Sequence, residues 1–147
     1  MQFSMSGDPG RRRFFLKIEP GEEVIGTLSA FARKQGITGA SLSGIGALRE
    51  TELGWYDTEE CQYLTEIFPE NLELLSLTGN LSCSGDRETV HAHALCASRT
   101  LSAVGGHLVK ATCAVTVEVT VVECGFPLNR AHDETFDLAL LDLPDRL

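Results

Sequence analysis

The sequence has 147 residues and a mass of 16.0 kDa, the usual size of a single domain, and its 43% hydrophobic and 22% charged residues exclude wholesale disorder. Twelve basic residues against 21 acidic ones give a net charge of −9, which repels DNA phosphates and anionic membranes, so DNA is a possible but disfavoured partner. No stretch approaches the roughly 20 apolar residues of a membrane span, and the polar N-terminus does not resemble a secretory signal, so we expect a cytoplasmic protein that does not bind membranes.

The N-terminal part of the chain predicts an arm, a strand and a helix, in that order. The polar and then basic residues 1–12 indicate a flexible arm, so we expect a single folded domain over 13–147. Apolar side chains alternate over residues 13–19, as they do in a strand. Over residues 22–35 the apolar spacing becomes helical, and Gly36 follows where a C-terminal cap belongs. We therefore predict one long amphipathic helix whose apolar stripe packs on a sheet.

The chain from residue 38 to residue 123 predicts strands. They are expected at 38–48, 52–56, 63–68, 72–81, 89–97 and 108–123, with 52–56 and 63–68 paired through the polar turn 57–60. Periodicity alone would also allow a helix at 72–81, but Ser76, Thr78 and Gly79 favour a strand. The segment 108–123 is longer than most strands and should bend or carry a bulge. Many strands and one helix predict an α+β fold with a largely antiparallel sheet that is covered on one face.

Three of the four histidines lie within residues 91–107. His91 and His93 are two residues apart in a predicted strand, so their imidazoles point to the same face. If the chain turns back near residues 99–102, an antiparallel partner strand brings His107 opposite His93, with Cβ atoms about 4.5–5.5 Å apart. Three such imidazoles suit zinc or another divalent transition metal, with a fourth position open to water or a ligand. The alternative is that these are pocket histidines bonded to backbone carbonyls.

The sequence contains no recognised catalytic motif beyond this trio. No H-E-x-x-H, G-x-S-x-G or P-loop pattern occurs. Glu73, Asp86 and Glu88 are candidate general bases by residue type only. Five cysteines without a C-x-x-C pair are expected to be reduced and mostly structural. Whether the chain is an enzyme therefore stays open, and a binding protein is favoured.

A set of short motifs follows one another in a specific order. They are Glu-Pro-Gly-Glu-Glu at 19–23, Ser-Gly-Ile-Gly-Ala-Leu at 43–48, Glu-Leu-Leu-Ser-Leu-Thr-Gly-Asn at 73–80, His-Ala-His at 91–93 and Gly-Gly-His-Leu at 105–108, with a weaker match at Arg130, Asp133 and Thr135. The set resembles the plants and prokaryotes conserved (PPC) domain, which also occurs in plant AT-hook nuclear proteins. The resemblance implies a stand-alone α+β domain that assembles as a homotrimer and carries a DNA-binding label. It also implies a metal site at His91, His93 and His107.

The matching stretches also contain the residues that we expect to line a ligand pocket, namely Gly46, Glu73, Gly105, Gly106 and Arg130. Two departures from the plant members count against DNA as a partner. The basic stretch at residues 9–13 lacks the central glycine and second proline of an AT-hook. Asn71 replaces the arginine of a plant stretch linked to partner contacts.

Two hypotheses follow from these observations. The first is a trimeric PPC-type domain that binds a metal ion or small ligand and acts through assembly or regulation. The alternative is a zinc-dependent hydrolase or lyase that acts on a small molecule, with the same three histidines as ligands. Chemical activity that a chelator abolishes and zinc restores would distinguish the second from the first.

Overall fold

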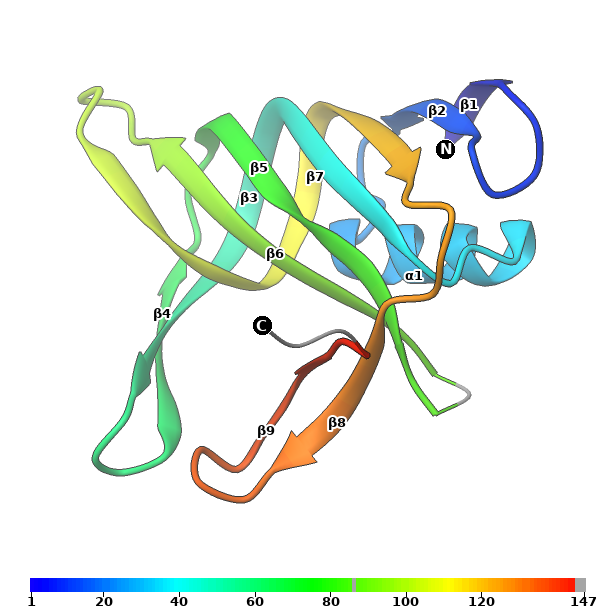
Figure 1. Cartoon of the computed structure of the whole chain (residues 1–147). Helices are drawn as coiled ribbons and strands as arrows, with labels where there is room; N and C mark the ends of the chain where they lie inside the picture. The colour runs from blue at the N-terminus through cyan, green and yellow to red at the C-terminus, as the bar shows by residue number, and fades with distance from the viewer. Residues whose placement is uncertain (86, 145–147) are drawn as a thin grey trace.

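The protein is described by a computed structural model that covers residues 1–85 and 87–144. Within these residues, one α-helix and nine β-strands follow one another (Figure 1). The elements are β1 (Gln2–Ser6), β2 (Arg13–Ile18), α1 (Val24–Gln35), β3 (Ala40–Asp57), β4 (Gln62–Phe68), β5 (Leu72–Ser84), β6 (Arg87–Ala97), β7 (Ala103–Glu123), β8 (Asn129–Asp133) and β9 (Leu138–Asp142). The mainly antiparallel sheet and single helix confirm the predicted fold class.

Four antiparallel pairings close a ring of strands. β3 pairs with β5, β5 with β6, β6 with β7, and β7 again with β3. β2 extends the sheet from β7, β1 pairs with β2, and β4 forms a hairpin with β3. The β8–β9 hairpin is joined to β5 by a short parallel pairing. In Figure 1 the β3–β4 and β8–β9 hairpins extend from the same side of the ring.

The helix is shorter than predicted. It begins at Val24 rather than Glu22, because Glu23 caps it by accepting hydrogen bonds from the N–H groups of Ile25 and Gly26. Glu22 stays outside the helix, where it accepts a hydrogen bond of 2.8 Å from the N-terminal ammonium. Gly36 ends the helix in the left-handed conformation, as predicted, with φ of 63°.

The buried face of α1 packs against β6 and β7 and joins one hydrophobic core. Val24, Leu28, Phe31 and Ala32 supply that face. Apolar side chains from the inner face of the ring complete the core. We call the opposite face of these strands the outer face. Of the helices within residues 1–85 and 87–144, none is both long enough and apolar enough to cross a membrane.

The N-terminal segment differs from the flexible arm predicted over residues 1–12. Residues Gln2–Ser6 form β1, which pairs in antiparallel register with β2. The reason is aromatic packing, since the Phe3 ring lies 5.3 Å from that of Phe31 and 6.3 Å from that of Phe14. Met1, Phe3 and Met5 alternate with polar residues as in a strand, but this run is short and a polar and basic stretch follows it, so the periodic signal is weak.

Two predicted strands, 38–48 and 52–56, are one long strand in the structure. β3 continues through Glu50, whose φ is 49°, and its pairing with β7 shifts register between Arg49 and Glu52. The glycines and charged residues that suggested a break mark this bulge instead. The β8–β9 hairpin was not predicted as strands.

The bend predicted for the long strand β7 is confirmed. Its buried side chains change parity between Leu108 and Ala111, at the register shift with β3. As a result Val109, which shares parity with the buried valines further along, is 38% exposed. Val115 is 65% exposed at a second register shift, where Gly46 pairs with Val117 but Leu48 pairs with Cys113. The same distortion lets β7 pair with β6 at one end and with β2 at the other.

Candidate metal centre

The three histidines lie together on the outer face of the β6–β7 hairpin. His93 lies directly opposite His107 in the register of the two strands, as predicted from the expected turn. That turn is closed by a hydrogen bond of 2.9 Å from the N–H of Ser98 to the carbonyl of Ser102. His91 follows the same face of β6, and the ring centroids are 5.3 Å (His91–His93), 5.2 Å (His91–His107) and 5.7 Å (His93–His107) apart. Sequence and register therefore bring all three side chains to one point.

The imidazoles can converge on one ion. One ring nitrogen of each lies within 4.8 Å of those of the other two. A metal at about 2.0–2.1 Å from three nitrogens in tetrahedral geometry holds them roughly 3.3 Å apart. Three ligands from the protein leave a coordination position for an outside molecule.

The protonation of the group suits metal binding. Burial, together with the nearby His91, His93 and Arg130, lowers the pKa of His107 to about 4. Burial, Arg130 and His93 also lower the pKa of His91. These two rings are therefore neutral at pH 7 and keep a lone pair for a cation. The Nδ1 atom of His107 is buried without a hydrogen-bond partner among the described residues, so it is not bonded to a backbone carbonyl as the alternative requires.

Two tyrosines form a wall beside His107. The ring of Tyr63, on β4, stacks on the His107 ring with centroids 4.9 Å apart and an interplanar angle of 30°. Gly54, on β3 opposite His107, leaves room for this contact, because a Cβ atom there would lie 2.9 Å from a ring carbon of Tyr63. Tyr56 packs edge-on against Tyr63 at 5.0 Å, and its hydroxyl donates a hydrogen bond to the carbonyl of Phe136. The β3–β4 and β8–β9 hairpins therefore meet beside the histidines.

Of the predicted pocket residues, the structure places Arg130, on β8, and the two glycines before His107 beside the three histidines. The guanidinium of Arg130 donates to the hydroxyl of Ser82 (2.8 Å), the side-chain carbonyl of Asn80 (3.1 Å) and the backbone carbonyl of Ala139 (2.7 Å). Asn80 lies directly opposite His91 in the β5–β6 register. Burial lowers the pKa of Arg130, and its charge reaches His91 and His107.

The remaining predicted pocket residues do not all gather at this point. Gly105 and Gly106 precede His107 on β7, and a Cβ atom at Gly106 would lie 2.7 Å from the carbonyl oxygen of Gly54. Gly46 pairs with Leu74 and Val117 at the bulge of β3. Glu73 lies elsewhere on β5, where it lines a hollow with Ala97 and Arg99. Gly46 and Glu73 are thus separate from the histidines.

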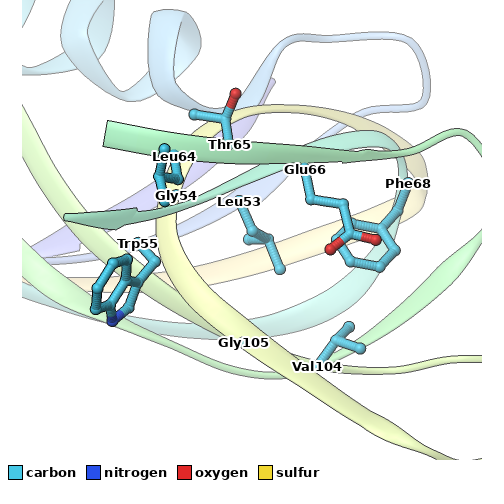
Figure 2. A pocket seen from close by; sticks show the side chains of 9 residues that line it. All are labelled: Leu53, Gly54, Trp55, Leu64, Thr65, Glu66, Phe68, Val104 and Gly105. Atoms are coloured by element: carbon cyan, nitrogen blue, oxygen red, sulfur yellow. The ribbon is translucent and has the colours of Figure 1, made fainter. Parts of the chain in front are cut away.

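A larger hollow lies on the opposite side of the β3–β4 hairpin. It has a volume of about 430 Å³ and is lined by Leu53, Gly54, Trp55, Leu64, Thr65, Glu66, Phe68, Val104 and Gly105 (Figure 2). Trp55 is 65% exposed at its rim. Gly105 is the one predicted pocket residue among these lining residues. No histidine contributes to this lining, so the hollow is distinct from the candidate metal centre.

None of the described candidate bases joins the imidazoles. Glu88 forms an ion pair of 2.9 Å with Arg33 of the helix, which also lowers its pKa, and Glu73 lies apart as described. Asp86 lies outside the described residues. Within the described part of the chain, no Asp, Glu or Cys completes the group that the three histidines form.

Sequence reasoning missed Tyr56, Tyr63, Asn80 and Ser82. Asn80 and Ser82 lie on the outer face of β5, on the same side as Thr78. This alternation along the strand could have been recognised in the sequence. The sequence contains no such signal for Tyr56 and Tyr63, because their position depends on how the β3–β4 hairpin curves toward β7.

Metal-free protein is expected to become less stable as the pH falls from about 6.5 toward 4. In this window the unfolded chain protonates His107 while the folded chain, with a pKa of about 4, resists protonation. The unfolded state then binds more protons, so the free energy of unfolding decreases with decreasing pH. Thermal unfolding of EDTA-treated protein should show this slope, and the variant His107→Gln should show a smaller one. Equal slopes would contradict the prediction.

Comparisons with known proteins agree with the fold and the motifs. Residues 5–125 match the model of the Plants and Prokaryotes Conserved (PCC) domain. A plant- and prokaryote-conserved (PPC) protein of Pyrococcus horikoshii is 28% identical, with a TM-score of 0.85 over 99% of this chain and 97% of that one. A metal-containing protein of Archaeoglobus fulgidus is 31% identical, with a TM-score of 0.83 and 97% of each chain covered.

A third similar structure is that of a protein of Bacteroides thetaiotaomicron called a "putative DNA binding protein". It is 26% identical to this chain, with a TM-score of 0.87 over 95% of this chain and 96% of that one. A search of curated proteins found no match. The three similar structures are thus described as a PPC protein, a putative DNA binding protein and a metal-containing protein.

Proposed function

The chain belongs to the Plants and Prokaryotes Conserved (PCC) domain family, and on that premise we propose that it is a single-domain regulatory protein that binds zinc or another divalent transition metal. His91, His93 and His107 would be the ligands. The observation that carries this proposal is that the three imidazoles converge. The buried Nδ1 of His107 has no hydrogen-bond partner among the described residues. The similarity to a metal-containing protein supports it. The metal would supply a Lewis acid with a position open to an outside ligand.

Metal content tests this proposal directly. Purified wild-type protein is expected to contain close to one equivalent of metal by elemental analysis, and the variant His93→Ala far less, because two imidazoles form an incomplete site. His132→Ala is the matched control, since His132 lies outside the trio and is 61% exposed beside Asp137. Equal metal content in wild type and His93→Ala would overturn the proposal.

We favour binding over catalysis because the group lacks a carboxylate. A zinc-dependent hydrolase or lyase needs a general acid or base near the metal-bound water. Glu88 is held in an ion pair with Arg33, and no described carboxylate joins the histidines. The net charge of −9 likewise opposes DNA binding, so the DNA-binding label of a similar protein does not extend to this proposal.

We also propose that the chain assembles as a homotrimer through its outer face. Phe15 on β2 and Ile45, Leu75 and Val115 on strands of the ring are 55%, 56%, 51% and 65% exposed, an unusual number of exposed apolar side chains for one sheet. Three of them, Phe15, Ile45 and Leu75, line one hollow of this face. The family resemblance supports three copies, and burial of these side chains would supply the driving force.

Light scattering should report a mass three times the chain mass of 16.0 kDa. The variant Ile45→Glu is expected to shift it to the monomer, because a carboxylate would be buried without a partner. Phe126→Ser is the control, since Phe126 is 59% exposed on the loop before β8. A monomeric wild type would contradict the proposed trimer.

A further inference from the structure

Arg130 is bonded to neutral groups alone. The three acceptors of its guanidinium are a hydroxyl, a side-chain amide oxygen and a backbone carbonyl, on Ser82, Asn80 and Ala139. Ser82 is 1% exposed, so this contact is partly buried. A guanidinium has five N–H donors, and these three bonds leave two of them for another partner.

Within residues 1–85 and 87–144, no carboxylate forms an ion pair with Arg130. The carboxylates in the loop of its own hairpin are turned to other groups. Asp133 accepts hydrogen bonds from the N–H groups of Thr135 and Phe136, and Asp137 lies 3.6 Å from His132. An arginine that is partly withdrawn from water without a carboxylate is unfavourable unless something else supplies negative charge.

The imidazoles add no negative charge. A divalent ion bound by His91, His93 and His107 keeps its full charge of +2, because neutral imidazole ligands do not offset it. Arg130 is near, because its guanidinium donates to the side chain of Asn80, which lies directly opposite His91 in the β5–β6 register. In a chain whose net charge is −9, the described surroundings of this centre are thus locally cationic.

The two hairpins limit what can approach. Tyr63 covers one side of His107, and the contact from Tyr56 to Phe136 closes the gap between the β3–β4 and β8–β9 loops. Cys61 lies 3.5 Å from the carbonyl oxygen of Thr135 at the same contact. Of the three histidines, only His93 is exposed, so the open side of the centre offers a small area of contact.

We propose that the centre binds a small molecule that carries a carboxylate or phosphate group, with Arg130 as the residue that selects the anion. The inference rests on the proposed function, since the anion would occupy the open position of the bound metal and accept hydrogen bonds from the remaining N–H groups of Arg130. Charge-assisted and bidentate bonds of this kind are the stronger ones that arginine makes with oxyanions.

Cobalt substitution tests the inference without any assay of activity. Co²⁺ bound by three histidines absorbs visible light, and the spectrum changes when an anion replaces water on the ion. Titration with inorganic phosphate, and separately with acetate, should give a saturating change in wild-type protein. In Arg130→Gln the apparent affinity should fall at least about 10-fold, since a hydrogen bond to a charged group is typically lost. Arg130→Lys should lie between the two, and Arg33→Gln, which breaks an ion pair on the helix, should match wild type.

The outcomes separate this inference from the proposed function. Equal anion affinity in wild type and Arg130→Gln, with Co²⁺ bound in both, overturns the inference and leaves the metal site standing. A wild type that binds no Co²⁺ overturns the proposed function. The inference is then decided on metal-free protein, where phosphate must raise Tm in wild type and not in Arg130→Gln. A stronger response to phosphate than to acetate, or the reverse, identifies which oxyanion the ligand carries.

Discussion

Zinc is expected to raise the Tm of the wild-type protein by about 10 °C and to leave that of His107→Gln unchanged. A ligand at 1,000 times its Kd stabilises a folded protein by about 4.1 kcal/mol. For a domain of this size, each kcal/mol corresponds to roughly 2–4 °C. His107 is the residue to change because its ring lies 5.2 Å from that of His91 and 5.7 Å from that of His93, and its buried Nδ1 has no other partner among the described residues.

The glutamine variant keeps a side chain under the Tyr63 ring, which separates loss of the ligand from loss of packing. Thermal unfolding with EDTA and with excess zinc provides the measurement. His132→Ala should respond as wild type does, because its ring lies outside the group. An equal rise of Tm in His107→Gln and wild type would show that zinc binds elsewhere.

Gly79→Ala is expected to destabilise the fold by about 3 kcal/mol or more. A Cβ atom at Gly79 would lie 2.0 Å from the carbonyl oxygen of His91 and 2.7 Å from the Cα of Ala92. Both are backbone atoms of β6, so no side chain can rotate to make room. The strand that carries two of the histidines would have to move away from β5, and the metal site would be lost with the stability.

Urea unfolding measures the stability, and zinc binding measures the site. Thr78→Ala, the exposed neighbour on the outer face of the same strand, is the control and should cost little. Wild-type stability in Gly79→Ala would mean that β5 and β6 can separate without loss, contrary to the close approach seen at this position.

The histidine trio could be predicted because it depends on local rules. Alternation puts His91 and His93 on one face, and a short turn sets His93 opposite His107. The helix was equally predictable, apart from its first residues, where a cap formed by Glu23 replaces the expected turn. In both cases the determining residues lie within one short, continuous stretch of the chain.

The parts that could not be predicted depend on contacts between distant segments. Tyr63 reaches His107 only because β3 stays continuous through Glu50 and curves with β4 toward β7. Arg130 reaches Asn80 only because β8 adds to the end of β5. Neither pairing produces a periodic pattern of apolar residues in the sequence, since β8 and β9 are short and their exposed residues mix apolar and polar types.

The guanidinium and the imidazoles come from parts of the chain that can change independently. The histidines stand on the β6–β7 hairpin, inside the stretch 5–125 that matches the family, whereas Arg130 comes from a hairpin beyond it that is joined to the sheet by a short parallel pairing. On the proposed function, exchange of that hairpin is expected to change which anion the centre selects and to leave the three nitrogen donors in place.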